Sequence, residues 1–113
     1  MKQGEIWNID LSPTIGAEIK KKRTAVIINH DAIGILPLRV IVPLTHWKDK
    51  FQGAGWMVKL DPDSRNNLKK PSAADCFQVR SVSTKRFLEQ TGSIPPKIMT
   101  QIKKAVKLVI DAD

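Results

Sequence analysis

The sequence lacks the features that mark secreted and membrane-bound proteins. It has a single cysteine, Cys76, which cannot form an internal disulfide. No apolar run approaches the roughly 20 residues needed to cross a bilayer. The first five residues, MKQGE, lack the apolar core of a signal peptide. These absences predict a cytoplasmic protein.

The common motifs of metal and nucleotide chemistry are also missing. His30 and His46 are the two histidines, and no Cys or His pair has metal-ligand spacing. There is no Walker A loop, no Gly-x-Gly-x-x-Gly and no Gly-x-Ser-x-Gly nucleophile elbow. A metal-dependent nuclease would need clustered carboxylates, whereas the 11 acidic residues are scattered singly. The sequence therefore favours chemistry without a metal or cofactor.

Positive charge is what the chain does have. Nineteen Lys and Arg against 11 Asp and Glu give a net charge of +8, with a pI near 9.9. A small domain this basic often binds a polyanion, because the release of counterions from phosphates drives association. The charge favours nucleic acid as a partner, and the alternative is a basic but inert soluble surface.

The hydrophobic pattern predicts one mainly β domain, residues 1–113, with a C-terminal helix. Alternation and β-branched runs predict five short strands, at 5–11, 24–29, 38–44, 56–60 and 74–82. Ser83 can cap a helical turn over 84–88. Apolar residues from Ile98 to Ile110 recur at helical spacing, with Pro95-Pro96 suited to the first turn. We expect a small β-barrel or a strongly curved sheet, closed by that helix.

Two segments contain candidates for chemistry at strand ends. Lys20, Lys21 and Lys22 lead into Arg23, whose guanidinium offers a planar fork of donors for phosphate oxygens. Such a run can equally be a solvated face. At the end of another predicted strand, Thr45 supplies a hydroxyl and His46 a group that titrates near neutrality. Their structural alternatives are a hydroxyl bonded to its own backbone and an exposed loop residue.

Further candidates would contact RNA rather than react with it. Trp47 can stack on a base or cover the barrel mouth, and Lys48 follows it with a positive charge. Gln78 and Arg80 are predicted to share one face of the strand at 74–82, where they could line a groove or lie in solvent-exposed sheet.

These segments, in this order, resemble the MazF/PemK family. The resemblance rests on Gly4-Glu5-Ile6-Trp7, Asp10-Leu11-Ser12-Pro13, Gly16-Ala17-Glu18, Arg23-Thr24-Ala25-Val26-Ile27, Val40-Ile41-Val42-Pro43-Leu44-Thr45, and Gln78-Val79-Arg80 followed by Arg86-Phe87. It covers nearly the whole chain. Three positions depart from the family pattern: Ala17 replaces a common Ser, Thr24 a usual Pro, and Phe77 a frequent acidic residue.

The resemblance implies an SH3-like barrel, usually a homodimer, that cuts single-stranded RNA without metal and is inhibited by an antitoxin. Arg23 and Thr45 match the two principal catalytic positions. We expect Arg23 to stabilise the phosphate charge and Thr45 to hold the phosphate, with His46 and Glu18 as candidate proton carriers. The cleavage motif would depend on loops at 13–22, 47–55 and 61–72.

Two other functions remain open at this point. One is a non-enzymatic toxin of the same fold that poisons DNA gyrase, and the other is a catalytically decayed RNA-binding barrel. Members of the gyrase-poisoning branch lack the Arg and Thr pair and use a C-terminal Trp, whereas this chain has Arg23 and Thr45 and ends in Val-Ile-Asp-Ala-Asp. Shared architecture alone does not decide between these functions.

Overall fold

The computed structural model describes residues 1–12, 15–18 and 22–113. Lys20 and Lys21, two of the predicted RNA-binding residues, lie outside the described residues. Within the described part, no helix is long and apolar enough to span a membrane.

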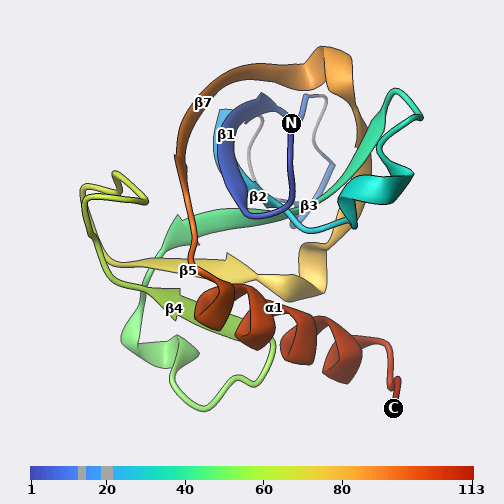
Figure 1. Cartoon of the computed structure of the whole chain (residues 1–113). Coiled ribbons are helices and arrows are strands. Elements are labelled where there is room, and N and C mark those ends of the chain that lie inside the picture. The colour runs from blue at the N-terminus through green and yellow to red at the C-terminus, as the bar shows by residue number, and fades with distance from the viewer. Residues whose placement is uncertain (13–14, 19–21) are drawn as a thin grey trace.

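Seven antiparallel strands form one strongly curved sheet, in which β7 arcs around β1 (Figure 1). The sheet order is β4-β5-β3-β2-β1-β7, and β6 pairs with β3 off this path. The strands are β1 (Glu5–Asp10), β2 (Lys22–Ile27), β3 (Leu38–His46), β4 (Met57–Leu60), β5 (Ser72–Asp75), β6 (Arg80–Ser83) and β7 (Phe87–Ser93). No pairing between β4 and β7 closes the described sheet, so the expected mainly β fold is confirmed as an open, barrel-like curve.

The central strands β2 and β3 are buried on both faces, which gives the molecule two apolar clusters. Val26 and Val42 face a cluster beneath the C-terminal helix α1 (Pro96–Val109). Their neighbours Ala25, Ile27 and Ile41 face a second cluster inside the curl of β1, β2, β3 and β6. Because side chains alternate along a strand, Arg23 and Thr45 belong to the face of this second cluster.

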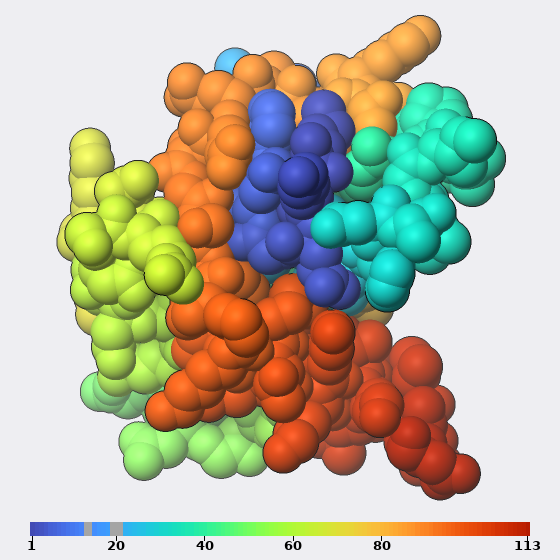
Figure 2. Space-filling model, viewed as in Figure 1, coloured from blue at the N-terminus to red at the C-terminus, as the bar shows by residue number. Residues whose placement is uncertain are grey.

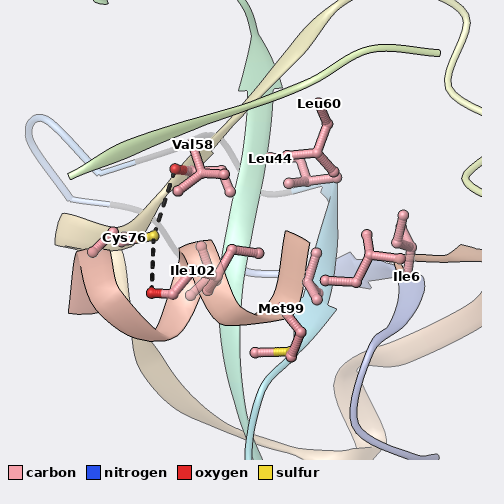
Figure 3. Packing of buried hydrophobic residues seen from close by; sticks show 12 residues of the cluster. Ile6, Leu44, Val58, Leu60, Cys76, Met99 and Ile102 are labelled. Carbon is pink, nitrogen blue, oxygen red and sulfur yellow. Dashed lines mark hydrogen bonds between the residues drawn. The ribbon is translucent and has the colours of Figure 1, made fainter. Parts of the chain in front are cut away.

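Helix α1 covers the first cluster, as its sequence pattern predicted. Met99, Ile102 and Ala105 are its buried residues, and Pro96 occupies the first turn, where a missing N–H costs no hydrogen bond. Figure 3 shows Ile102 beside Cys76, and Met99 belongs to the same cluster as Leu44 and Val58. The helix therefore covers one face of the central strands, and the second cluster fills the other.

Two sequence predictions about strands are wrong. The predicted strand at 74–82 is broken into β5, a 3₁₀ helix η3 (Cys76–Gln78) and β6, because the Asp75 side chain accepts a hydrogen bond from Phe77 N and caps the turn. Gln78 and Arg80 therefore do not share one strand face. The strand β7 was not predicted at all. The short turn after Ser83 is present as the 3₁₀ helix η4 (Thr84–Arg86), and Ser83 accepts from Lys85 N.

The chain between β4 and β5, residues 61–71, is an ordered loop lying against β7. Figure 2 shows its yellow-green atoms beside the orange atoms of that strand. Ser93 N donates to Arg65 O at 3.0 Å, and Asn67 Nδ2 donates to Thr91 O at 2.9 Å. The loop thus begins at the end of β4, ends at the start of β5, and is bonded between them to the edge strand β7.

Candidate functional site

Arg23 and Thr45 come together because β2 and β3 run antiparallel. Ala25 of β2 is paired with Pro43 of β3, and each candidate lies two residues beyond this pair, toward the same end. A step of two residues keeps the side chain on the same face of a strand. The two residues matched by the family resemblance therefore lie on one face at one end of the strand pair.

A cavity of about 300 Å³ opens at this place. It lies between the ends of β1, β2 and β3 and the loop 61–71. Its lining contains four of the predicted site residues, together with polar and basic neighbours: Asn8, Lys22, Arg23, Thr24, Leu44, Thr45, His46, Leu68, Lys69, Lys70 and Ser72. The structure thus gathers Lys22, Arg23, Thr45 and His46, which the sequence had placed on two separate strands.

The lining of this cavity is strongly basic. Lys22, Arg23, Lys69 and Lys70 all contribute to it, and no carboxylate does. None of these four cations makes an ion pair with an acidic side chain among the described residues. The Nε of Arg23 is buried and has no hydrogen-bond partner in the described part of the chain. A buried donor without a partner costs free energy, so the Arg23 side chain is held at the cavity in an incompletely satisfied position.

Glu18, Gln78 and Arg80 line a second cavity, of about 260 Å³. Arg80 Nη1 lies 3.7 Å from Glu18 Oε2, and both side chains are partly exposed. Gln78 Nε2 donates to Asp75 Oδ2 at 3.0 Å. Pro43 lines this cavity and precedes Thr45 on the same face of β3, so the two cavities follow each other along that strand. The four predicted catalytic residues are therefore divided, with Glu18 apart from the other three.

Trp47 and Lys48 line neither of these two cavities. The Trp47 ring packs edge-on against Phe51, with centroids 5.8 Å apart, and Lys59 Nζ lies 5.2 Å from its centroid. In this structure the Trp47 ring thus packs between Phe51 and Lys59. Lys48 is exposed beside it.

Phe77, which stands where the family often has an acidic residue, lies on η3 next to a buried carboxylate. Phe77 is 67% exposed, and its ring contacts Trp56 with centroids 6.3 Å apart. The neighbouring Asp75 is buried, and its two carboxylate oxygens accept from Phe77 N and Gln78 Nε2. Asp75 thus holds η3 in place and does not line the basic cavity.

Lys69 and Lys70 line the cavity although the sequence did not indicate them as candidates. The loop 61–72 was expected to influence RNA specificity, but nothing in its composition indicated which side chains reach the cavity. Asn8 was also missed, although its position on the polar face of β1 is visible in the alternation. No group of three or more His, Cys, Asp and Glu side chains among the described residues could hold a metal ion.

Comparison with known proteins identifies a family for the chain. A family model described as "PemK-like, MazF-like toxin of type II toxin-antitoxin system" matches residues 2–110. Endoribonuclease MazF9 of Mycobacterium tuberculosis is 30% identical over 117 residues, covering 98% of this chain and 97% of that protein. Endoribonuclease PemK of Escherichia coli is 30% identical over 104 residues, covering 90% of this chain and 76% of that protein.

Solved structures show the same fold at lower identity. MazF of Deinococcus radiodurans superimposes with a TM-score of 0.79 at 19% identity, covering 98% of this chain and 96% of that one. An endoribonuclease in complex with its cognate antitoxin, from a mycobacterial species, gives 0.77 at 16% identity, covering 100% and 97%.

The fold and the cavity define a small basic domain with an open, curved sheet and a cation-lined cavity at the end of two central strands. The chain belongs to the PemK-like, MazF-like toxin family of type II toxin–antitoxin systems.

Proposed function

We propose that this protein is an endoribonuclease toxin that cleaves single-stranded RNA by attack of the 2′-hydroxyl, without a metal or cofactor. The observation that carries the proposal is the cavity in which Arg23, Thr45 and His46 meet among cations and no carboxylate. The names of the two curated relatives, both endoribonucleases, support the same activity and disfavour a gyrase poison.

RNA supplies its own nucleophile. The protein therefore has to align the 2′-hydroxyl with the phosphorus, stabilise the charge on the phosphate and move two protons. The 2′-oxygen bonds to phosphorus while the bond from phosphorus to the 5′-oxygen breaks. One proton leaves the 2′-hydroxyl and one reaches the departing 5′-oxygen. The products are a 2′,3′-cyclic phosphate, or the 3′-phosphate to which it hydrolyses, and a 5′-hydroxyl.

Each residue of the cavity has a role in this scheme. Arg23 donates to the phosphate oxygens and stabilises the charge that builds there, because a guanidinium stays protonated at neutral pH. Thr45 donates a hydrogen bond that fixes the phosphate. His46 is the proton carrier in this scheme, since it lines the same cavity. Glu18 lies in the second cavity and is the weaker candidate for this role.

The RNA continues from the reacting phosphate into the second cavity. Lys22, together with Lys20 and Lys21, attracts the backbone. Arg80 offers guanidinium donors beside Gln78 and Pro43, where a base edge can be read. Trp47 and Lys48 contribute at the rim of the groove.

The whole domain, residues 1–113, acts as a homodimer in the bacterial cytoplasm and is inhibited by an acidic antitoxin. Complexes with antitoxin among the solved neighbours support the partner. The net charge of +8 supports its acidity, because an acidic segment complements the basic cavity.

The test is cleavage of a mixed RNA by the purified protein in EDTA. We expect cleavage to persist in EDTA, to fall by about 100-fold or more in Arg23→Ala as for loss of one charge-stabilising donor, and to be unchanged in Lys85→Ala. A substrate with 2′-deoxyribose at the cut site should resist. Sequencing the RNA ends reports the cut site and chemistry together.

Three outcomes would contradict the proposal. Cleavage that disappears in EDTA removes the metal-free mechanism, and full activity of Arg23→Ala removes the assigned charge stabiliser. Binding of RNA without any turnover would instead indicate a decayed RNA-binding domain.

A further inference from the structure

One wall of the basic cavity comes from the loop 61–71, outside all predicted catalytic segments. Leu68, Lys69 and Lys70 line the cavity from this loop. Both lysines are exposed, and neither makes an ion pair with a described acidic residue. Holding unpaired cations beside Lys22 and Arg23 opposes folding through like-charge repulsion. A loop that keeps them there calls for an explanation.

Asn66 fixes the chain just before the two lysines. Its side chain is buried, with 4% of the residue exposed. Its Oδ1 accepts from Asp63 N at 3.0 Å and from Leu68 N at 2.9 Å, and its Nδ2 donates to Asp61 O at 2.8 Å. One side-chain amide thus connects three points of the loop, and one of these, Leu68, directly precedes Lys69.

The backbone of Asn66 also packs closely against Gly92 of β7. A Cβ built on Gly92 would lie 2.5 Å from Asn66 O and 2.8 Å from Arg65 O. Because these are backbone atoms, a side chain at Gly92 would push the loop away. The Asn67 side chain and the Arg65 carbonyl, both bonded to β7, complete the attachment.

The chain is fixed again directly after the lysines. Ser72 is buried, and its hydroxyl donates to Lys70 O at 3.1 Å. Trp47 N donates to Pro71 O at 2.9 Å, and Ser72 is paired with His46 across β3 and β5. Lys69 and Lys70 are therefore a two-residue span between fixed points, joined at one end to the strand that bears Thr45 and His46.

We propose that Lys69 and Lys70 form a second phosphate-binding element, which holds RNA backbone next to the reacting phosphate, and that Asn66 is its positioning residue. The inference rests on the proposed function and adds residues to its site. A backbone fixed in advance lowers the entropy lost when the lysines engage phosphates. Lysine acts there as a point charge, so the element contributes affinity and alignment but little base specificity.

The salt dependence of RNA binding tests the lysines. Dissociation constants for a fully 2′-O-methylated, uncleavable RNA oligonucleotide are measured between 50 and 200 mM NaCl. Each phosphate contact contributes about 0.7 to the slope of log affinity against log salt for single strands. We expect Lys69→Ala/Lys70→Ala to reduce that slope by about 1.4 relative to wild type. The matched control, Lys104→Ala/Lys107→Ala on the exposed side of α1, should leave it unchanged.

A double-mutant cycle tests Asn66. Asn66→Ala should weaken RNA binding in the wild-type background and have no further effect when Lys69 and Lys70 are already alanine. Gly92→Ala should behave in the same way. Circular dichroism confirms that each variant is folded at the assay temperature. An equal effect of Asn66→Ala in both backgrounds would show a merely structural role and overturn its assignment as a positioning residue.

The outcomes separate this inference from the proposed function. If the wild type cleaves RNA but Lys69→Ala/Lys70→Ala keeps the wild-type slope, the second phosphate-binding element is wrong and the nuclease remains. If the wild type neither binds nor cleaves RNA, both fail.

Discussion

His46 and Glu18 were equivalent candidates for moving protons when the sequence alone was considered, and the structure separates them. His46 lines the cavity of Arg23 and Thr45, whereas Glu18 lines the neighbouring cavity and is paired with Arg80 at 3.7 Å. A general acid or base has to be within hydrogen-bond reach of the proton it transfers. The geometry therefore favours His46 for chemistry and Glu18 for binding.

Two amide substitutions distinguish these roles. We expect His46→Gln to lower kcat by about 100-fold or more, the usual contribution of a positioned acid or base. Glu18→Gln should change kcat by less than about 10-fold and alter the preference among RNA sequences instead. Single-turnover cleavage with excess enzyme measures the first effect, and sequencing of cut ends measures the second. A larger kcat loss in Glu18→Gln than in His46→Gln would reverse the assignment.

The same scale shows why some site residues could be predicted and others could not. Arg23 and Thr45 lie at the ends of strands with clear apolar patterns. The resemblance to the MazF/PemK family assigned both to one site. Lys69 reaches the cavity because Asn66 is seated on Gly92, a contact between segments far apart in the sequence. No local pattern encodes such a contact, so composition could indicate a basic loop but not its direction.

At the scale of elements, helix α1 and the strands with strong alternation were predicted well. The strand at 74–82 was wrong because the capping hydrogen bond of Asp75 competes with strand pairing, which hydrophobic pattern does not detect. Strand β7 was missed because its sequence, FLEQTGS, contains no fully buried residue. Pairing with β1 along its length, rather than side-chain burial, forms this strand.

Cys76 of η3, which packs against α1, should make the stability of the fold depend on pH. Cys76 Sγ lies 3.7 Å from Ala74 O and 4.0 Å from Ile102 O (Figure 3). Burial, with a smaller contribution from the Asp75 charge, raises the pKa of this thiol from 9.0 to about 12. Above pH 9 the unfolded chain loses the thiol proton while the folded chain keeps it. Stability should therefore fall as pH rises from about 9 to 12, by at most about 1.4 kcal/mol per pH unit.

Urea unfolding at pH 8.5 and at pH 10 (both about 25 °C) measures this loss, with Cys76→Ala as the control. The variant is expected to be less stable at both pH values, because the substitution removes buried atoms. Its decrease between the two pH values should be smaller than that of the wild type. An identical decrease in both proteins would show that burial of the Cys76 thiol does not cause the pH dependence.

For the whole molecule, the net charge of +8 affects folding and function in opposite directions. The described residues contain two ion pairs, Met1 with Glu5 and Arg80 with Glu18, so Arg80 alone among their Lys and Arg side chains is in an ion pair. Self-repulsion of this kind disfavours the compact state, and salt screens it. The positive charge proposed to attract RNA is thus maintained at some cost in stability, to which Lys22, Arg23, Lys69 and Lys70 contribute.

Raising NaCl from 20 to 300 mM should therefore raise the Tm of the free protein while it weakens RNA binding. Thermal unfolding followed by circular dichroism, with and without the uncleavable oligonucleotide, measures both effects in one series. At low salt the oligonucleotide should increase Tm, because it binds the folded state, and the increase should vanish as the salt concentration rises. Lys69→Ala/Lys70→Ala should have a higher Tm than wild type at 20 mM NaCl and a smaller response to salt. A Tm of the free protein that falls with added NaCl would mean that its attractive charge pairs outweigh the repulsion at the site.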